Sequence, residues 1–502
     1  MKKYDVIVVG AGVGGLAAAC KLAKEGVKTL LLEKHNIPGG ALTSFRRGRF
    51  EIESGVHYVA HFGTKEKPQT LYKILDEFGV AEHIDPRPLH QIVILRREGQ
   101  EDIYLPNNYD DAVKHLKETY PEEIAGIDKY FEVINGVMKD YLNLFHFDYD
   151  YPNPLDHMDP EATPEKYPYF HKYAYMPTLE FMAETGIKNR DLFFLLTIMS
   201  NHSGPPQFNT VIDLADWMYY ILQCAPVKLP GGFQQVSSLM AEKVEEFGGE
   251  VIYNQEMTEI IVENGAVAGV RTSDGKEYRA PVVMYNGSPL RVFRSMVKPG
   301  DVPAGIVGEI MSEMKGYYDF DRVGLCTYFC LDCPPEEVGI TKAVQFCQGA
   351  GSNYRSLYQV DCTEAMGGVF HKPDRCNVTF FTYSSYRDWI SCPPEEYHKK
   401  KMEAEAAAVA EANRLFPGFS DHIEEVDVFT PVTIGRYLGH PGGSFAGFRV
   451  YNRDYLLNPM QINNRLPGLY FVGGWFNNVG CVHPCLAGGY GVAKAYLETI
   501  QK

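Results

Sequence analysis

The stretch Tyr4-Asp5-Val6-Ile7-Val8-Val9-Gly10-Ala11-Gly12-Val13-Gly14-Gly15 decides the fold of this chain. Its apolar first half predicts a short buried strand that runs directly into a glycine-rich turn. Small and apolar residues at positions 16–23 then predict a closely packed helix, and Gly26 ends it. A second apolar strand over 27–32 stops at Glu33. The pattern is therefore a complete βαβ unit.

The glycines of this turn have separate physical roles. Gly10 makes the tight turn, Gly12 lets the backbone approach a pyrophosphate, and Gly15 lets the helix pack closely on the strand. The anion would then lie on the amides and the positive dipole of the helix N-terminus, beside Val13 and Gly14. The turn therefore predicts a dinucleotide-binding site.

The acid at the end of the second strand narrows the choice of nucleotide. Glu33 lies about twenty residues beyond the turn, where a carboxylate accepts hydrogen bonds from the hydroxyls of the adenosine ribose. A negative charge at this position disfavours a 2′-phosphate and so argues against NADP. Lys34, the next residue, is expected in the same site.

A second glycine pair and an aromatic-acidic segment follow the acid. Gly39-Gly40 comes first, and Phe50-Glu51-Ile52-Glu53-Ser54-Gly55-Val56-His57-Tyr58-Val59 comes next. This order of motifs resembles the amine oxidase and phytoene desaturase superfamily of FAD flavoproteins. The sequence of residues 50–59 is most similar to the branch that contains retinol saturase and carotenoid isomerase. The resemblance implies an α/β fold, with a Rossmann-like FAD-binding domain interleaved with an α+β substrate domain of mixed sheet and helices.

The resemblance also implies a cofactor, non-covalent FAD, and the residues around it. In that superfamily, the second glycine pair and its neighbours line the pyrophosphate and the flavin. The positions of this chain that match are Gly39, Gly40, Ala41, Leu42, Gly55, Val56 and His57. One complete dinucleotide fingerprint is visible, so NAD(P)H would bind without a second Rossmann domain, or another donor would supply electrons.

The length of 502 residues exceeds one compact core and predicts two intertwined domains. We expect the FAD-binding domain to be discontinuous and the substrate domain to fill the intervals. The expected FAD-binding segments are 1–68, 226–290 and 455–502, and the expected substrate-domain segments are 69–225 and 291–454. By resemblance, Val251 or a neighbour lies beside the adenine.

The end of the chain carries the last cofactor motif. A strand over 466–472 runs into Gly473 and Gly474, and 480–482 (Gly480, Cys481, Val482) lead into the final helix. In the resembled superfamily this strand usually ends in Gly-Asp, with the Asp on the ribityl chain, and the helix N-terminus points at the flavin pyrimidine. Here Gly474 replaces that Asp, which leaves this contact open.

Composition excludes several classes of protein. Hydrophobic residues make up 45% and charged residues 22% of the chain, as in a folded globular protein. The net charge of -16 argues against a nucleic-acid partner, because such proteins need a basic face. No apolar window is long enough for a transmembrane helix, and the N-terminus does not resemble a signal peptide. We therefore expect a cytoplasmic protein; peripheral membrane contact and oligomeric state stay open.

The cysteines predict packing rather than metal binding. Eleven cysteines in a cytoplasmic chain indicate buried thiols more often than disulfides. The spacing Cys326-x-x-x-Cys330-x-x-Cys333 matches the cluster loop of radical SAM enzymes, but it lies in an apolar stretch typical of a strand. We expect these thiols to pack in the core and expect no metal site.

The candidate catalytic residues are few, because a flavin itself carries the hydride chemistry. Protein groups then orient the substrate and move a proton. His57, His440 and His483 each lie in a motif expected at the flavin, with Tyr58 and Cys481 as weaker candidates. A lone histidine is more often a hydrogen-bonded structural residue, so both interpretations stand.

An aromatic segment over 141–177 has two interpretations. It is either a surface excursion whose rings pack on the body, or a lid over an apolar channel. The apolar stretches 192–199 and 214–222 could line that channel or belong to an ordinary core.

The resemblance implies an FAD-dependent oxidoreductase that acts on carbon-carbon double bonds of an apolar, conjugated isoprenoid or lipid-like substrate. Saturation, desaturation and redox-neutral isomerisation all remain open. The alternatives are an amine oxidase-like flavoprotein and a flavin- or lipid-binding protein without turnover.

Overall fold

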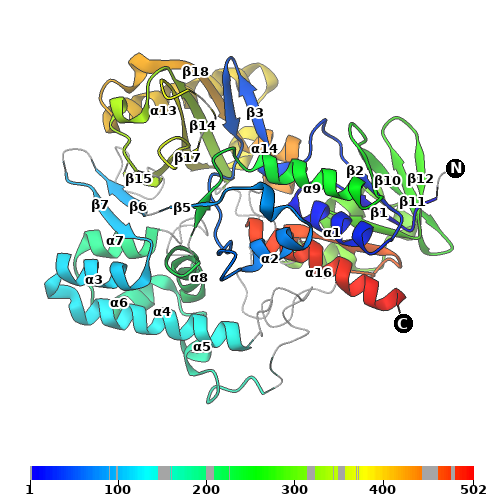
Figure 1. Cartoon of the computed structure of the whole chain (residues 1–502), viewed down its shortest axis with the longest axis horizontal. Helices are drawn as coiled ribbons and strands as arrows, with labels where there is room; N and C mark the ends of the chain where they lie inside the picture. Colours follow the sequence, from blue (N-terminus) through cyan, green and yellow to red (C-terminus); the bar gives the residue numbers. More distant parts are fainter. Residues whose placement is uncertain are drawn as a thin grey trace.

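The computed structural model of the chain describes most of its residues, in segments. These are 3–89, 91–97, 100–144, 159, 161–198, 209–224, 226–313, 323–342, 344–348, 357–368, 370, 372–443, 462–475 and 481–501. Figure 1 shows a parallel sheet with helices α1, α9 and α16 beside it, a mixed sheet with helix α13, and a layer of helices from α3 to α8.

Among the described residues, the parallel sheet has five strands in the order β19-β13-β1-β2-β9. The strands are β1 (Val6–Val9), β2 (Thr29–Leu32), β9 (Glu250–Ile252), β13 (Val282–Tyr285) and β19 (Leu469–Phe471). β1 and β2 pair in parallel and are joined by α1 (Val13–Lys24). Both strands are buried throughout, as their continuous apolar runs predict. The predicted βαβ unit is confirmed.

Helices pack on α1 at very short range. One core joins α1 to α2 (Thr70–Glu77), α9 (Gln234–Glu246) and α16 (Val482–Ile500). A Cβ at Gly489 of α16 would lie 1.8 Å from the carbonyl oxygen of Gly14, and a Cβ at Gly14 would lie 2.5 Å from the Cα of Gly473. The last helix and strand of the chain therefore pack directly on the first turn of α1, and only glycine permits this distance.

A second, three-stranded sheet covers part of the other face. Its strands are β10 (Met257–Glu263), β11 (Ala266–Thr272) and β12 (Glu277–Arg279). β10 and β11 are joined by a hairpin turn at Asn264-Gly265, with φ of 52° and 76° at the two residues. Positive φ at both central positions matches the twist of the hairpin.

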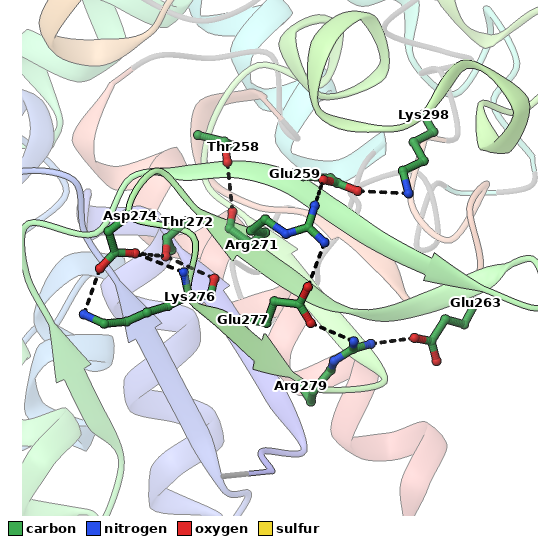
Figure 2. A network of polar contacts seen from close by, with 10 residues as sticks. All are labelled: Thr258, Glu259, Glu263, Arg271, Thr272, Asp274, Lys276, Glu277, Arg279 and Lys298. Atoms are coloured by element: carbon green, nitrogen blue, oxygen red, sulfur yellow. Dashed lines mark hydrogen bonds and ion pairs between the residues drawn. The ribbon is translucent and has the colours of Figure 1, made fainter. Parts of the chain in front are cut away.

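Ion pairs across these three strands form the network in Figure 2. Arg271 pairs with Glu259 on β10 and with Glu277 on β12, the latter at 2.7 Å. Arg279 pairs with Glu263 at 2.6 Å and with Glu277 at 2.8 Å. Partly exposed pairs of this kind each contribute roughly 0–1 kcal/mol, so the network supports the register of the sheet more than its stability.

The mixed sheet has seven strands among the described residues, in the order β18-β14-β17-β16-β15-β6-β7. They are β6 (Gln91–Arg96), β7 (Ile103–Pro106), β14 (Val323–Leu331), β15 (Val344–Gln348), β16 (Leu357–Cys362), β17 (Cys376–Ser384) and β18 (Ile423–Phe429). Neighbouring strands are antiparallel except β15 and β6. One face packs Phe329, Val378 and Phe380 against Ala408 and Ala412 of α13 (Pro394–Leu415).

The opposite face of the mixed sheet meets the hairpin of β3 (Ser44–Arg47) and β4 (Phe50–Glu53). Figure 1 shows β3 beside β14. The Tyr328 hydroxyl donates to the carbonyl of Ser54, and the Asn377 amide donates to the carbonyl of Glu51. The segment that follows β4 therefore lies between the mixed sheet and the part of the molecule that contains the parallel sheet.

Helices form the remaining layer. They are α3 (Tyr109–Thr119), α4 (Ile124–Leu144), α5 (Pro168–Tyr173), α6 (Thr178–Thr185), α7 (Arg190–Ile198) and α8 (Val211–Leu222). The shorter elements are α10 (Pro289–Arg291), α11 (Ile306–Glu313), α12 (Tyr386–Ile390) and α14 (Pro431–Leu438), and the strand pair β5 (Arg87–Pro88) and β8 (Val227–Lys228). None of the helices in the described segments combines the length and the apolarity that a membrane crossing requires.

The aromatic segment is described only in part. Residues 145–158 and 160 lie outside the described residues. Tyr167, Phe170 and Tyr173 are buried in the same core as α4, which matches packed surface structure for that part. Leu192 and Leu214 are buried in this core as well. The lid hypothesis for 141–177 stays a prediction, because much of this segment lies outside the described residues.

The three cysteines with cluster-like spacing do not converge. Cys326 and Cys330 pack with Phe50 and Ile52 on one face of the mixed sheet, whereas Cys333 packs in the core under α13 on the other. Thiols on opposite faces of one sheet cannot ligate one ion, so this spacing reflects core packing.

All strands of the parallel sheet fall in the predicted segments 1–68, 226–290 and 455–502. All strands of the mixed sheet fall in 69–225 and 291–454. The domain boundaries themselves stay a prediction.

Gly15→Ala should destabilise the protein. The new Cβ would lie 2.0 Å from the carbonyl oxygen of Gly10, and overpacking of this kind costs about 1–3 kcal/mol or more. Gly308→Ala on exposed α11 is the control, because nothing lies within 4 Å of its Cβ and alanine favours a helix by up to about 1 kcal/mol. Thermal unfolding followed by circular dichroism should show a lower midpoint for the first variant only. Equal midpoints for Gly15→Ala and the wild type would contradict this account.

Candidate functional site

The glycine turn at the N-terminus of α1 is built to receive an anion. Gly10 has φ of 96° and donates its N–H to the carbonyl of Leu32 at 2.8 Å. Gly12 is the N-cap of α1, and no side chain in the described residues caps this end of the helix. The first-turn N–H groups of α1 are therefore available to a ligand.

The second glycine pair lies against this turn. Gly39 and Gly40 have φ of 127° and 60°, a backbone region that favours glycine. The Gly39 N–H donates to the carbonyl of Ala11 at 2.7 Å, and a Cβ at Gly40 would lie 3.2 Å from the Cα of Gly12. The two glycine motifs thus form one wall of backbone.

Glu33 ties the end of β2 to the same turn. One carboxylate oxygen accepts from the N–H of Ala11 at 2.7 Å, and the other accepts from the N–H of His35 at 2.8 Å. The side chain is only 5% exposed. Each oxygen retains a lone pair, so the carboxylate can also accept from ribose hydroxyls.

A cavity runs along these groups and encloses about 1130 Å³ of space that includes open solvent. Many of the residues predicted from the sequence line it. They are Gly10, Gly12, Val13, Gly14, Glu33, Lys34, Gly39, Gly40, Ala41, Leu42, Val56, His440, Gly474 and Val482. The N-termini of two helices, α1 and α16, thus contribute to one cavity, an arrangement that fits a dinucleotide with a pyrophosphate near one helix and a ring system near the other.

Other predicted residues do not line the cavity. They are Gly15, Gly55, His57, Tyr58, Val251, Gly473, Cys481 and His483, and Gly480 lies outside the described residues. Val251 packs on the core around α1. Residues 255–257, a little later in the chain, line the cavity.

The sequence reasoning missed a further group of lining residues. They are Val9, Leu32, His35, Gln255, Glu256, Met257, Tyr285, Asn286, Arg291, Met296, Tyr437, Leu438 and Cys485. Asn286 donates from its side chain to the carbonyl of Gly10 at 3.3 Å, and it is the side chain nearest to Gly12. Its position at the carboxyl end of β13 was a usable signal, because ligands of open α/β sheets bind beyond those ends.

Two cationic side chains border the cavity. Lys34 donates to the carbonyl of Arg436 at 3.0 Å, and burial together with the charge on Arg291 lowers the pKa of Lys34. Arg291 pairs with Glu256 at 2.9 Å. These charges favour an anionic ligand at this side of the cavity.

A buried ion pair lies next to the predicted residue His57. Glu53 pairs with Lys228, which is fully buried, and its other oxygen accepts from the N–H of Phe233 at 3.2 Å. Burial would raise the pKa of Glu53, but the charges of Lys228 and His57 outweigh burial and hold that pKa low. The Nδ1 atom of His57 lies 3.7 Å from a Glu53 oxygen.

Aromatic rings gather around the start of α16. His483 stacks on His61 with ring centroids 4.0 Å apart, and Tyr220 of α8 lies 6.0 Å from each ring. Tyr58 lies 6.4 Å from Tyr220, and burial followed by the charges of Asp361 and Cys481 raises the pKa of Tyr58. The structure thus brings Tyr58, His483 and Cys481 together, whereas His440 lies at the cavity beside α14.

The stacked histidines are neutral at pH 7. Burial lowers the pKa of His61 from 6.5 to about 4, and burial together with His61 lowers that of His483 well below 6.5. His61 was not predicted from the sequence. It has φ of 60°, a strained backbone value for a residue other than glycine that its neighbours must impose.

Comparison with known proteins agrees with this geometry. The family described as an NAD(P)-binding Rossmann-like domain matches residues 8–78. An oxidoreductase from Methanosarcina mazei has a TM-score of 0.63 at 16% identity, covering 99% of this chain and all of its own. Cyclohexylamine oxidase from Brevibacterium oxydans has a TM-score of 0.63 at 16% identity over the whole of both chains. At these identities the likeness concerns the fold.

The fold is that of solved amine oxidases, and together with the matched Rossmann-like domain it supports a flavin-type cofactor. More narrowly, the chain is homologous to prolycopene isomerase and all-trans-retinol 13,14-reductase, which confirms the resemblance read from residues 50–59. The prolycopene isomerase of Arabidopsis thaliana is 26% identical over 94% of this chain and 78% of its own. The reductase of Danio rerio is 24% identical over 88% of this chain and 77% of its own.

The stability of the protein should decrease as the pH is lowered, because the folded state disfavours the protonated form of His61. A histidine whose pKa is lower in the folded than in the unfolded state binds protons preferentially when unfolded, so stability is lost as pH falls from 6.5 to below 4. The shift from 6.5 to about 4 corresponds to about 3 kcal/mol.

His61→Asn should flatten this part of the pH profile, because asparagine tolerates positive φ and does not titrate. Urea unfolding at a series of pH values measures the effect. His83→Asn is the control, since the His83 side chain is 49% exposed. If the free energy of unfolding changes equally between pH 6.5 and 4 in the wild type and in His61→Asn, the lowered pKa of His61 is refuted.

Proposed function

We propose that this chain binds FAD non-covalently in the cavity beside the glycine turn. One observation gives the main support. A single cavity is lined by the N-termini of α1 and α16, by Glu33, and by both glycine motifs, the turn at 10–14 and the pair Gly39-Gly40. Gly10, Gly12, Val13 and Gly14 would hold the pyrophosphate on the amides of α1. Glu33 would accept from the adenosine ribose.

The flavin end of the cofactor would lie toward α16 and the segment after β4. Val56, Gly474 and Val482 line this part of the predicted site. Gly474 offers no carboxylate to a ribityl hydroxyl, so a backbone group or another side chain must make that contact. Asn286, which lies between the glycine turn and β19, is close to Gly473 and could serve.

The chain is an enzyme of the oxidoreductase type, and we propose that it acts on carbon-carbon double bonds of an apolar, conjugated isoprenoid-like substrate. The support comes from its homologues, one named as an isomerase of prolycopene and the other as a reductase of all-trans-retinol. A bound flavin would supply the redox chemistry, since its reduced form donates a hydride in saturation and its oxidised form accepts one in desaturation. The protein must hold the substrate, exclude water and move a proton.

The candidate proton carriers divide by location. His57 and Tyr58 follow β4, in the segment that lies against the mixed sheet. His483 lies in the aromatic group with His61. We propose His57 as the proton carrier, because its Nδ1 lies 3.7 Å from the buried carboxylate of Glu53. Tyr58 and His483 would contact the substrate, and His440 the cofactor.

The test is a flavin spectrum during anaerobic reduction by NADH, NADPH and dithionite, followed by turnover with polyenes, enones and primary amines. Reduction by one donor and turnover of a polyene would support the proposal and identify the donor and the direction. Turnover of amines alone would favour the amine oxidase alternative, which the fold of the solved neighbours also allows.

Gly12→Val should abolish FAD binding, because the branched side chain would occupy the place of the pyrophosphate. The nearest atom to a Cβ at this position is the flexible side chain of Asn286, at 2.7 Å, so the fold itself should tolerate the change. The flavin absorbance of the purified protein measures occupancy. Gly308→Val on exposed α11 is the control for the introduced valine. Full flavin occupancy in Gly12→Val would disprove the site.

Glu33→Ala should weaken FAD binding without abolishing it. Charge-assisted hydrogen bonds to a ribose typically contribute about 1.5–3 kcal/mol, which corresponds to roughly a 10- to 150-fold rise in the Kd of FAD. Glu33→Gln should lose less, since an amide oxygen can still accept. Titration of the apoprotein with FAD gives the Kd, and an unchanged value would show that Glu33 serves only the backbone of Ala11 and His35.

A further inference from the structure

Three side chains with metal-ligand chemistry meet at one end of the mixed sheet. They are Asp332, Cys333 and His422, and one carboxylate oxygen, the thiol sulfur and one ring nitrogen all lie within 4.8 Å of one another. Asp332 is exposed, His422 is half-buried and Cys333 is buried. None of the three lines the cofactor cavity, so this cluster is separate from the proposed flavin site.

The pairing of β14 with β18 brings the cluster together. Leu331, the last residue of β14, lies opposite Ile423, the first residue of β18. Asp332 and Cys333 follow β14 and His422 precedes β18, so the two segments leave the sheet at the same end. The Asp332 N–H donates to the carbonyl of His422 at 3.0 Å, which extends the pairing by one hydrogen bond. The backbone therefore holds together two segments that are 90 residues apart in the sequence.

The Asp332 and His422 side chains already have a separation that suits a shared ion. His422 Nδ1 lies 3.0 Å from Asp332 Oδ1. Zinc binds nitrogen and carboxylate oxygen at about 2.0–2.2 Å, so two such ligands of a tetrahedral ion lie roughly 3.4 Å apart. A thiolate bound at about 2.3 Å lies roughly 3.6 Å from each of them. The Cys333 sulfur therefore has to approach the pair by about 1 Å at most, a movement that side-chain rotation permits.

The combination of donor atoms selects the kind of ion. A thiolate together with an imidazole and a carboxylate suits Zn²⁺, whereas Mg²⁺ and Ca²⁺ take oxygen ligands. An aspartate and a histidine by themselves would form an ordinary surface ion pair, and the thiol beside them is what distinguishes this cluster. Three protein ligands leave one tetrahedral position for water, which reaches the site because Asp332 is exposed.

The thiol keeps its proton until an ion binds. Burial, followed by the charges of Glu337 and Asp332, raises the pKa of Cys333 to about 11. The thiolate is the form that ligates a metal, so binding releases this proton to solvent. The negative charges of the thiolate and the carboxylate then balance the two positive charges of the ion.

We propose that Asp332, Cys333 and His422 form a zinc site that joins the end of β14 to the start of β18. This proposal replaces the expectation from the sequence that the chain has no metal site, since strand pairing, and not cysteine spacing, assembles the ligands. An ion held by both segments binds the folded state in preference to the unfolded one, so Zn²⁺ should stabilise the protein. The proposal does not depend on the proposed function.

The first test replaces zinc with Co²⁺, whose tetrahedral thiolate complexes absorb in the visible and near ultraviolet. The full-length protein is treated with a chelator and titrated with Co²⁺, and difference spectra remove the flavin absorbance. We expect a saturable thiolate-to-cobalt charge-transfer band that disappears when Zn²⁺ is added. Cys333→Ser should lose this band completely. His422→Ala should raise the Kd for Co²⁺ more than about 10-fold, since losing even an outer-shell partner has an effect of that size.

Matched controls carry the same substitutions at positions outside the cluster. Cys392 is half-buried and His398 is exposed, and both lie at the start of α13 or just before it. Cys392→Ser and His398→Ala should keep the charge-transfer band and the wild-type Kd for Co²⁺. A wild type that shows no such band in excess Co²⁺ would overturn the proposal, and so would a full band in Cys333→Ser.

The second test is thermal unfolding with and without Zn²⁺. The midpoint of the wild type should rise with the Zn²⁺ concentration, because the ion binds the folded state. Asp332→Ala should lose most of this rise, and the fold should tolerate the change because Asp332 is exposed. Asp421→Ala is the control, since Asp421 is an exposed acid next to His422 that is not in the cluster. A rise of wild-type size in Asp332→Ala would overturn the assignment of this ligand set.

If Cys333→Ser does not fold, as judged by circular dichroism, Asp332→Ala and His422→Ala decide the outcome. Loss of Co²⁺ and Zn²⁺ binding in both variants, with the fold retained, would support the site. Wild-type binding in both would overturn it. Failure of the wild type to bind FAD would instead refute the proposed function and leave the zinc site unaffected.

Discussion

The close approach of backbones at the glycine turn is the constraint on which the rest of the structure depends. A Cβ at Gly15 would lie 2.0 Å from Gly10, and one at Gly489 would lie 1.8 Å from Gly14. Because no side chain separates these segments, the first strand, the first helix and the last helix of a long chain meet within a few ångströms. The cavity exists at this point because three glycine-rich segments leave room for a ligand where side chains would otherwise lie.

A different physical rule governs the contact between the mixed sheet and the segment around β4. Here the mixed sheet places Asn377 against the carbonyl of Glu51 on β4 and Tyr328 against the carbonyl of Ser54. Burial of charge is costly unless the charge is paired, and the Glu53–Lys228 pair meets that condition while Asp361 does not.

Much of the cofactor site could be predicted because its chemistry uses backbone and short-range order. Gly10, Gly12, Glu33 and the pair Gly39-Gly40 lie within one continuous stretch, and turn geometry requires glycine there. Asn286 and Arg291 were missed, because only the order of strands in the parallel sheet brings β13 beside β1 and so places them at the cavity. Val251 or a neighbour is expected at the adenine from resemblance, and 255–257, a few residues later, line the cavity.

The sequence by itself determined the βαβ unit, a flavin-type cofactor and the resemblance to the carotenoid isomerase and retinol saturase branch. These follow from local patterns, in which a residue type and its neighbours specify the backbone. Only the tertiary structure decided that His61 stacks on His483 and that Glu53 pairs with Lys228. Such contacts join positions up to several hundred residues apart, and their energies depend on burial and pairing, which arise only when the chain has folded.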